Sequence, residues 1–97
     1  MQTWMLSIEA GESGLSPFQE KALWAIRQEM TNFEFRTEGQ SDPYLVATVP
    51  PSGALVYVYR DGAALQGVSM DVRFERWDYE SPGELIDALI KKLRGLF

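Results

Sequence analysis

The chain contains no histidine and no cysteine among its 97 residues. Histidine is the usual general base near neutral pH, and cysteine supplies thiolate nucleophiles, disulfides and soft metal ligands. Their absence excludes hydrolases that need a histidine partner, zinc sites of the common kind and disulfide-stapled folds. We therefore expect a protein that is not an enzyme and that uses no metal or cofactor.

Basic charge is also scarce. The chain carries 9 basic and 14 acidic residues, which gives a formal charge of −5. Its only basic cluster is the short run Lys91-Lys92-x-Arg94. Because a nucleic-acid interface needs clustered Lys and Arg to contact phosphates, we expect no nucleic-acid partner.

Long hydrophobic runs are absent as well. The longest, Ala54 to Tyr59, is far shorter than the roughly 20 apolar residues of a membrane-spanning helix. The start of the chain, MQTWMLSIE, lacks the basic segment and the continuous apolar stretch of a signal peptide. The sequence thus predicts no membrane partner and a cytoplasmic location.

What the chain does have is 45% hydrophobic residues, enough for the core of one domain over residues 1–97. Residues 3–10 alternate apolar and polar side chains, which is the period of a half-buried strand. Ser16, Pro17 and Gln19 then form a capping box with proline at the first helical position, so we expect a helix over 17–31. Its apolar face would consist of Phe18, Ala22, Leu23, Ala25, Ile26 and Met30.

The middle of the chain predicts a series of antiparallel strands. Runs of β-branched and aromatic residues separated by turn residues place strands at 33–38, 44–49, 54–59 and 68–79. Pro50 to Gly53 gives a hairpin connection, and Asp61-Gly62 has the composition of a two-residue type I′ turn. In the last predicted strand, one face would be formed by Val68, Met70, Val72 and Phe74.

A second helix is predicted after Ser81, because Ser81-Pro82-Gly83-Glu84 repeats the capping device and Gly95 offers a stop. Its apolar face would consist of Leu85, Ile86, Leu89, Ile90, Leu93 and Leu96. The resulting order, β-α-β-β-β-β-α, indicates an α+β fold. We expect a two-layer sandwich with a mainly antiparallel sheet of four to five strands and two helices on one face.

Carboxylates can perform acid–base chemistry without histidine. Asp71 and Glu75 would share one strand face, but Arg73 lies between them, and this pattern is typical of a solvated face with cross-strand charge pairs. The acidic residues from 78 to 84 lack the spacing of a calcium loop, and helix capping explains Glu84. We assign no catalytic or metal-binding residue here.

The loop Gly11 to Gly14 precedes a helix, as phosphate-binding loops do. It lacks the lysine and the spacing of such a loop, and Glu12 would repel an anion. We interpret it as an ordinary turn and assign no cofactor-binding residue.

Aromatic residues give the strongest interaction signal. Trp77 and Tyr79 would fall on the same strand face as Arg73, and this residue set is the composition of interface hot spots. We therefore predict Arg73, Trp77 and Tyr79 as partner-binding residues. Trp24 likewise lies away from the apolar face of the first helix.

On the strand at 54–59, the row Leu55, Tyr57 and Tyr59 points opposite to Val56 and Val58, so one of the two rows would be exposed. These features favour a small acidic, non-catalytic protein-interaction domain, for example an inhibitor or immunity-type binder of a larger protein. An alternative is a homo-oligomeric structural or scaffold subunit, in which a second copy covers the Val56/Val58 row or an edge strand. A third is a small-ligand-binding protein or carboxylate-based enzyme with a pocket between sheet and helices.

Overall fold

The computed structural model describes residues 14–29, 36–39, 42–50 and 52–96. Its elements are α1 (Pro17–Glu29), β1 (Arg36–Glu38), β2 (Tyr44–Val49), β3 (Ala54–Val58), β4 (Ala63–Gly67), β5 (Met70–Phe74), the short 3₁₀ helix η1 (Arg76–Asp78) and α2 (Pro82–Arg94). The strand predicted at 3–10 lies outside the described residues, as do positions 30–31 of the predicted helix and 33–35 of the predicted strand.

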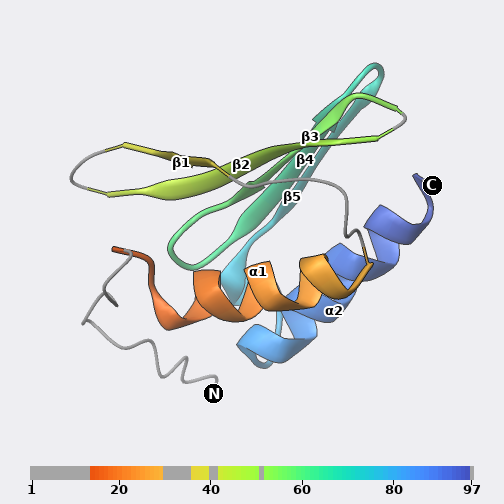
Figure 1. Cartoon of the computed structure of the whole chain (residues 1–97). Coiled ribbons are helices and arrows are strands. Elements are labelled where there is room, and N and C mark those ends of the chain that lie inside the picture. The colour runs from red at the N-terminus through yellow and green to blue at the C-terminus, as the bar shows by residue number, and fades with distance from the viewer. Residues whose placement is uncertain (1–13, 30–35, 40–41, 51, 97) are drawn as a thin grey trace.

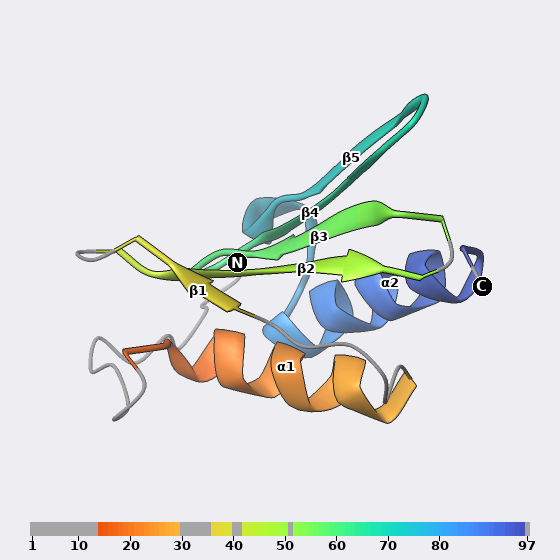
Figure 2. The ribbon, with the colours of Figure 1, turned by 45° about the horizontal axis from the view of Figure 1, so that its top comes forward.

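The strands form one antiparallel sheet in the order β1-β2-β3-β4-β5, so each strand pairs with the next one along the chain. Both helices cover the same face of this sheet (Figure 1). The predicted two-layer α+β sandwich is thereby confirmed. Figure 2 shows the β4–β5 hairpin projecting beyond the other strands and away from the helix layer. No helix in the described part of the chain is long and apolar enough to cross a membrane.

Among the described residues, five strands lie between the helices, where the sequence predicted four. The additional strand is β4, whose sequence AALQG has few of the β-branched and aromatic residues that mark strands. Pairing with β3 on one side and β5 on the other holds this segment in the sheet. Tertiary pairing therefore determines β4, which weak local propensity did not reveal.

The long strand predicted at 68–79 is shorter in the structure, since β5 covers only Met70–Phe74. Val68 was predicted on the apolar face but lies in the β4–β5 turn with 97% of its surface exposed. The next residue, Ser69, has a φ of 60°, a left-handed conformation that reverses the chain. Trp77 belongs to η1 and does not extend the strand.

The turn predicted at Asp61-Gly62 is also different. The backbone N–H of Tyr59 donates to the carbonyl of Gly62 at 2.7 Å, which makes Arg60 and Asp61 the central pair. Neither Asp61 nor Gly62 has a positive φ, so the turn is not type I′. Glycine serves close packing here, because a Cβ at Gly62 would lie 3.0 Å from the carbonyl oxygen of Phe74.

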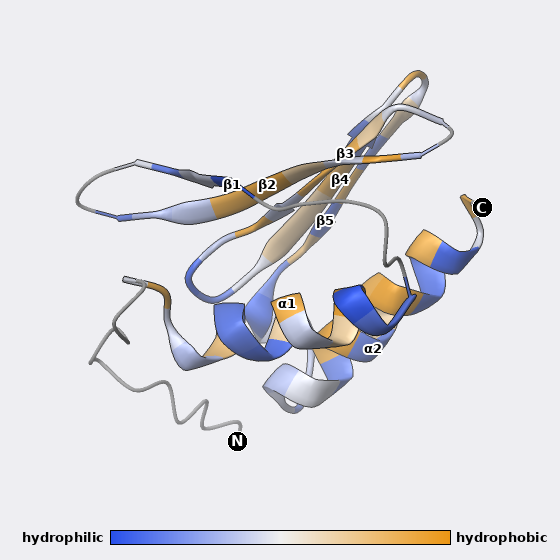
Figure 3. Ribbon diagram, viewed as in Figure 1, coloured by the Kyte–Doolittle hydropathy of each residue, from blue (hydrophilic) through white to orange (hydrophobic). Residues whose placement is uncertain are grey.

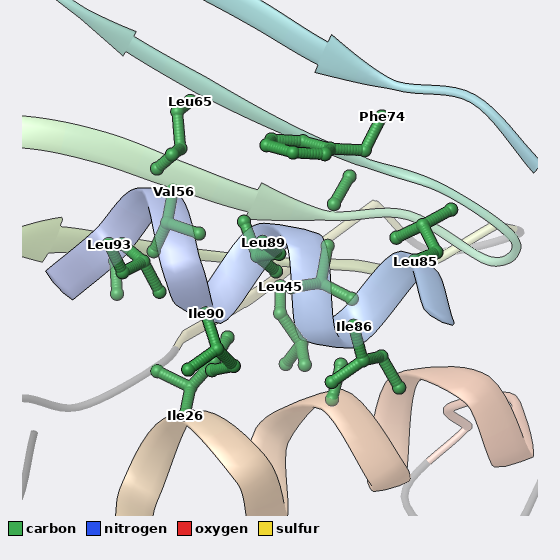
Figure 4. Packing of buried hydrophobic residues seen from close by; sticks show 14 of the residues in the cluster. Ile26, Leu45, Val56, Leu65, Phe74, Leu85, Ile86, Leu89, Ile90 and Leu93 are labelled. Carbon is green, nitrogen blue, oxygen red and sulfur yellow. The ribbon is translucent and has the colours of Figure 1, made fainter. Parts of the chain in front are cut away.

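The hydrophobic core fills the space between the sheet and the helices (Figure 4). Leu45, Val56, Leu65 and Phe74 point from successive strands towards α2 and Ile26 of α1. Val56 and Val58 are therefore core residues, and the suggestion that a second copy covers their row is wrong. The opposite row, with Leu55 and Tyr57, faces away from the helices because side chains alternate along a strand.

The capping box predicted at the start of α1 is confirmed and is buried. The Gln19 backbone N–H donates to the Ser16 Oγ at 3.2 Å, and the Ser16 N–H donates to the Gln19 Oε1 at 2.8 Å. The Gln19 amide also donates to the carbonyls of Pro43 and Val58, and the Ser16 hydroxyl donates to the carbonyl of Arg60. One helix terminus thus satisfies backbone groups at the ends of β2 and β3.

Helix α2 begins and ends where the sequence indicates. The Glu84 N–H donates to the Ser81 Oγ at 3.2 Å, and Gly95 caps the other end with a φ of −71°. The predicted apolar residues Leu85, Ile86, Leu89, Ile90 and Leu93 are buried. Figure 3 shows hydrophilic and apolar residues mixed along both helices, and the apolar residues Leu23, Ala25 and Ala88 are partly buried against the core. At the C-terminal ends of the two helices, Arg94 and Glu29 form a two-pronged ion pair.

Candidate interaction surface

We call the sheet face turned away from α1 and α2 the outer face. A cross-strand row on this face runs through Arg36, Val46, Tyr57, Ala64 and Arg73, one residue from each strand. Val46 is only 1% exposed and Ala64 only 4% exposed, although neither belongs to the core cluster beneath the sheet. The outer face therefore has apolar packing of its own and is not a uniformly solvated surface.

Three tyrosines pack against one another on the outer face. The ring centroids of Tyr57 and Tyr59 lie 6.0 Å apart with the rings stacked at 2°. Tyr44 is tilted against both, at 6.3 Å from Tyr57 and 5.6 Å from Tyr59. We call these residues the tyrosine cluster. Mutual packing fixes the rings, so their contact area is available at a low entropic cost.

A pocket of about 330 Å³ adjoins the tyrosine cluster. Ala64 lines it, because this small side chain lies between the much larger Tyr57 and Arg73 in the cross-strand row. Tyr59 and Arg73 also line this Ala64 pocket, together with the polar side chains of Asp61, Gln66 and Glu75. The pocket thus combines an aromatic wall with charges of both signs.

The environment of Tyr59 favours its neutral phenol. Partial burial raises the pKa of Tyr59, and the neighbouring Tyr57 and Tyr44 raise it further, while Arg73 acts in the opposite direction. A phenol held in its neutral form can donate a hydrogen bond from its hydroxyl as well as accept one. Tyr59 therefore presents a hydrogen-bond donor beside the cation of Arg73.

The three residues predicted to bind a partner lie in different settings. Arg73 is exposed on β5 and lines the Ala64 pocket. Trp77 projects from η1 with 74% of its surface exposed, and it is not among the residues that line the pocket. Tyr79 is partly buried and packs against the core, so it has a structural contact in addition to any partner contact.

The segment that carries Trp77 is tied to the rim of the Ala64 pocket. An Arg76 Nη1–H donates to the Asp61 Oδ2 at 3.3 Å, which joins η1 to the turn between β3 and β4. Asp61 is itself a pocket residue. This contact holds the base of η1 next to the outer face.

The acidic residues considered for acid–base or metal chemistry are Asp71, Glu75 and those from 78 to 84, and all lie in the part of the chain that the structure describes. Within those residues there is no group of three or more acidic side chains placed to hold a metal ion. Glu75 lines the Ala64 pocket, whereas Asp71 is exposed on β5 and is not among the residues that line the pocket. Gly11 to Ser13, in the loop weighed for phosphate binding, lie outside the described residues.

Sequence reasoning missed the contributions of Tyr44 and Ala64. The signal for Tyr44 was present, because it alternates with Leu45 and so lies on the same face as Val46. Ala64 gave no signal, since only the pairing of β4 between β3 and β5 places it between Tyr57 and Arg73. Comparison with protein-family models, curated proteins and solved structures gave no match to this chain.

Proposed function

We propose that this protein is a small, non-catalytic interaction domain that binds a protein partner through the outer face of its sheet. The observation that carries the proposal is the fixed tyrosine cluster beside the Ala64 pocket and the exposed Arg73. Tyrosine, tryptophan and arginine are the residues most enriched at interface hot spots. An aromatic anchor from a partner would fit the pocket, with Trp77 contacting the partner at the rim.

Charge supports a partner with a basic surface. The protein has a formal charge of −5, so its field attracts a cationic partner and speeds the encounter. A role as an inhibitor or immunity-type binder, which covers part of a larger basic protein, fits this charge and the small size of the domain. The association rate of such a pair falls as salt is added, because salt screens long-range attraction.

The test is an affinity capture from cells of the source with wild-type protein and matched variants. Arg73→Ala and Trp77→Ala each remove a residue of the proposed surface. Trp24→Ala is the control, since Trp24 is similarly exposed, at 68%, but lies on α1. Circular dichroism and thermal unfolding establish that all variants fold.

We expect a protein that is retained by the wild type and by Trp24→Ala, and lost with Arg73→Ala and Trp77→Ala. Binding of the purified partner should weaken by more than about tenfold for each surface variant. Equal retention by all four proteins, or loss with Trp24→Ala alone, would contradict the proposal. A small molecule retained in place of a protein would identify the Ala64 pocket as a ligand site.

A further inference from the structure

Strand β5 is the last strand of the sheet, and it has a pairing partner on one side only among the described residues. Figure 2 shows it as the outermost strand on the side opposite β1. Unpaired backbone groups on such an edge are a template for another strand. On the helix side of this edge, Met70 and Val72 remain partly exposed although they pack against the core. Among the described residues, the outer backbone edge of β5 is therefore unpaired, and Met70 and Val72 beside it are only partly covered.

The hairpin geometry shows which backbone groups of β5 point outward. The two-residue turn Val68–Ser69 places Gly67 and Met70 as the closing pair, which is a hydrogen-bonded pair in such hairpins. Hydrogen-bonded pairs then recur at every second position along the ladder. The N–H and C=O groups of Asp71 and Arg73 therefore point away from β4, towards the free edge.

Side-chain charge on the same two residues is self-complementary. Asp71 and Arg73 are both exposed, and neither forms an ion pair with a residue that the structure describes. If a second β5 runs antiparallel with Val72 opposite Val72 of the other copy, each Asp71 lies opposite an Arg73. Opposite charges directly across an antiparallel pair are stabilising, whereas like charges are destabilising.

Neighbouring registers are less favourable. A pairing centred on residue 73 places Arg73 opposite Arg73 of the other copy. A pairing centred on residue 71 places Asp71 opposite Asp71. A pairing centred on Phe74 would extend into η1, where the chain is helical and cannot continue the ladder. The register centred on Val72 alone pairs all five residues of β5 and leaves no like charges opposite each other.

We infer that two copies of this chain form a symmetric dimer through antiparallel pairing of β5 with β5, centred on Val72. A two-fold axis through Val72 makes the interface isologous, as in most soluble dimers. The two sheets become one continuous sheet with all four helices on the same side. Met70, Val72 and Phe74 of each copy meet beneath the seam, and the two outer faces adjoin above it.

The first test is a charge exchange measured by light scattering and sedimentation over a wide concentration range. Wild-type protein should be a dimer. Asp71→Arg and Arg73→Asp each place like charges across the seam, and each should raise the dimer dissociation constant by at least about tenfold. The double variant Asp71→Arg/Arg73→Asp restores opposite charges and should dimerise like the wild type. A monomeric wild type, or single variants that dimerise unchanged, would overturn the inference.

The second test is a disulfide at the proposed two-fold axis. The natural chain has no cysteine, so Val72→Cys carries a single thiol. In a non-hydrogen-bonded antiparallel pair the two Cα atoms lie about 4.5 Å apart, within the range that a disulfide bridges. Thr48→Cys, which is exposed on β2, is the control. Covalent dimer should form with Val72→Cys and not with Thr48→Cys, and the reverse result would place the interface elsewhere.

Arg73 belongs to both the proposed partner surface and the proposed dimer edge, so Trp77 separates the two proposals. Trp77→Ala should lose the partner and keep the dimer, because Trp77 lies in η1 beyond the paired strand. Failure of the dimer would leave the outer face of a single copy available, and failure of partner capture would leave the β5 pairing intact.

Discussion

At the scale of single residues, Gln19 is a buried polar side chain that forms hydrogen bonds with three backbone groups. It is 1% exposed, yet it accepts a hydrogen bond from Ser16 and donates to the carbonyls of Pro43, which precedes β2, and of Val58 in β3. A buried amide that satisfies three backbone groups fixes where α1 meets β2 and β3. Glu84 occupies the equivalent position of the capping box at α2, but it is exposed and bonds only within its own helix terminus.

This contrast predicts that alanine lowers the free energy of unfolding more at position 19 than at position 84. Gln19→Ala should reduce the free energy of unfolding by about 2–3 kcal/mol, because buried carbonyl and N–H groups lose their partners. Glu84→Ala should cost about 0.5–1 kcal/mol, since water replaces the lost contacts at that exposed terminus. Urea unfolding followed by circular dichroism compares the two. Similar losses would show that burial of the Gln19 network contributes little.

At the scale of elements, the two helices are joined at their C-terminal ends by a surface ion pair. The Arg94 guanidinium donates to both carboxylate oxygens of Glu29, and these hydrogen bonds lower the pKa of Glu29 below its ordinary value of 4.5. Because the folded-state pKa is depressed, the pair contributes stability above the pKa of the unfolded chain. That contribution disappears as the pH falls through the folded-state pKa.

A pH series of unfolding measurements tests this linkage. Arg94→Gln should be less stable than the wild type at neutral pH, and the difference should shrink below about pH 4.5 as Glu29 is protonated. Added salt should reduce the difference at neutral pH, because the Arg94 side chain is largely exposed to solvent. Arg94→Lys, which keeps the charge without the two-pronged geometry, is the control. A difference that stays constant down to pH 3 would exclude the pair as its cause.

At the scale of the whole molecule, the sheet separates two kinds of apolar residue. Those on the helix side form the core, and those on the outer face form the tyrosine cluster and the rim around the Ala64 pocket. The exposed residues of the proposed partner surface, Arg73 and Trp77, and the charged residues of the proposed dimer edge, Asp71 and Arg73, lie outside the core. We therefore expect that these exposed residues can be changed without loss of the fold.

The difference between core and surface residues can be measured with two alanine substitutions, one at each kind of position. Leu89→Ala removes a fully buried side chain of α2 and should cost about 2–5 kcal/mol of unfolding free energy. Trp77→Ala removes a larger but exposed side chain and should change stability by no more than about 0.5 kcal/mol. Thermal or chemical unfolding gives both values. A large loss with Trp77→Ala would show that Trp77 supports the fold.

The sequence by itself determined the elements whose signals are local. The capping boxes at Ser16 and Ser81, the helical spacing of the apolar residues in α2 and the turn residues at 50–53 all act over a few neighbouring positions. Local propensity and periodicity are sufficient for these features, which is why the helices and the two-layer α+β class were predicted.

Only the tertiary structure decided the features that depend on pairing between distant segments. The low-propensity strand β4 exists because two neighbouring strands bond to it, and the Ala64 pocket exists because β4 places a small residue between Tyr57 and Arg73. The burial of Gln19 likewise depends on carbonyls 24 and 39 residues away along the chain. Such contacts have no periodic signature, because they arise from which strands become neighbours in the folded sheet.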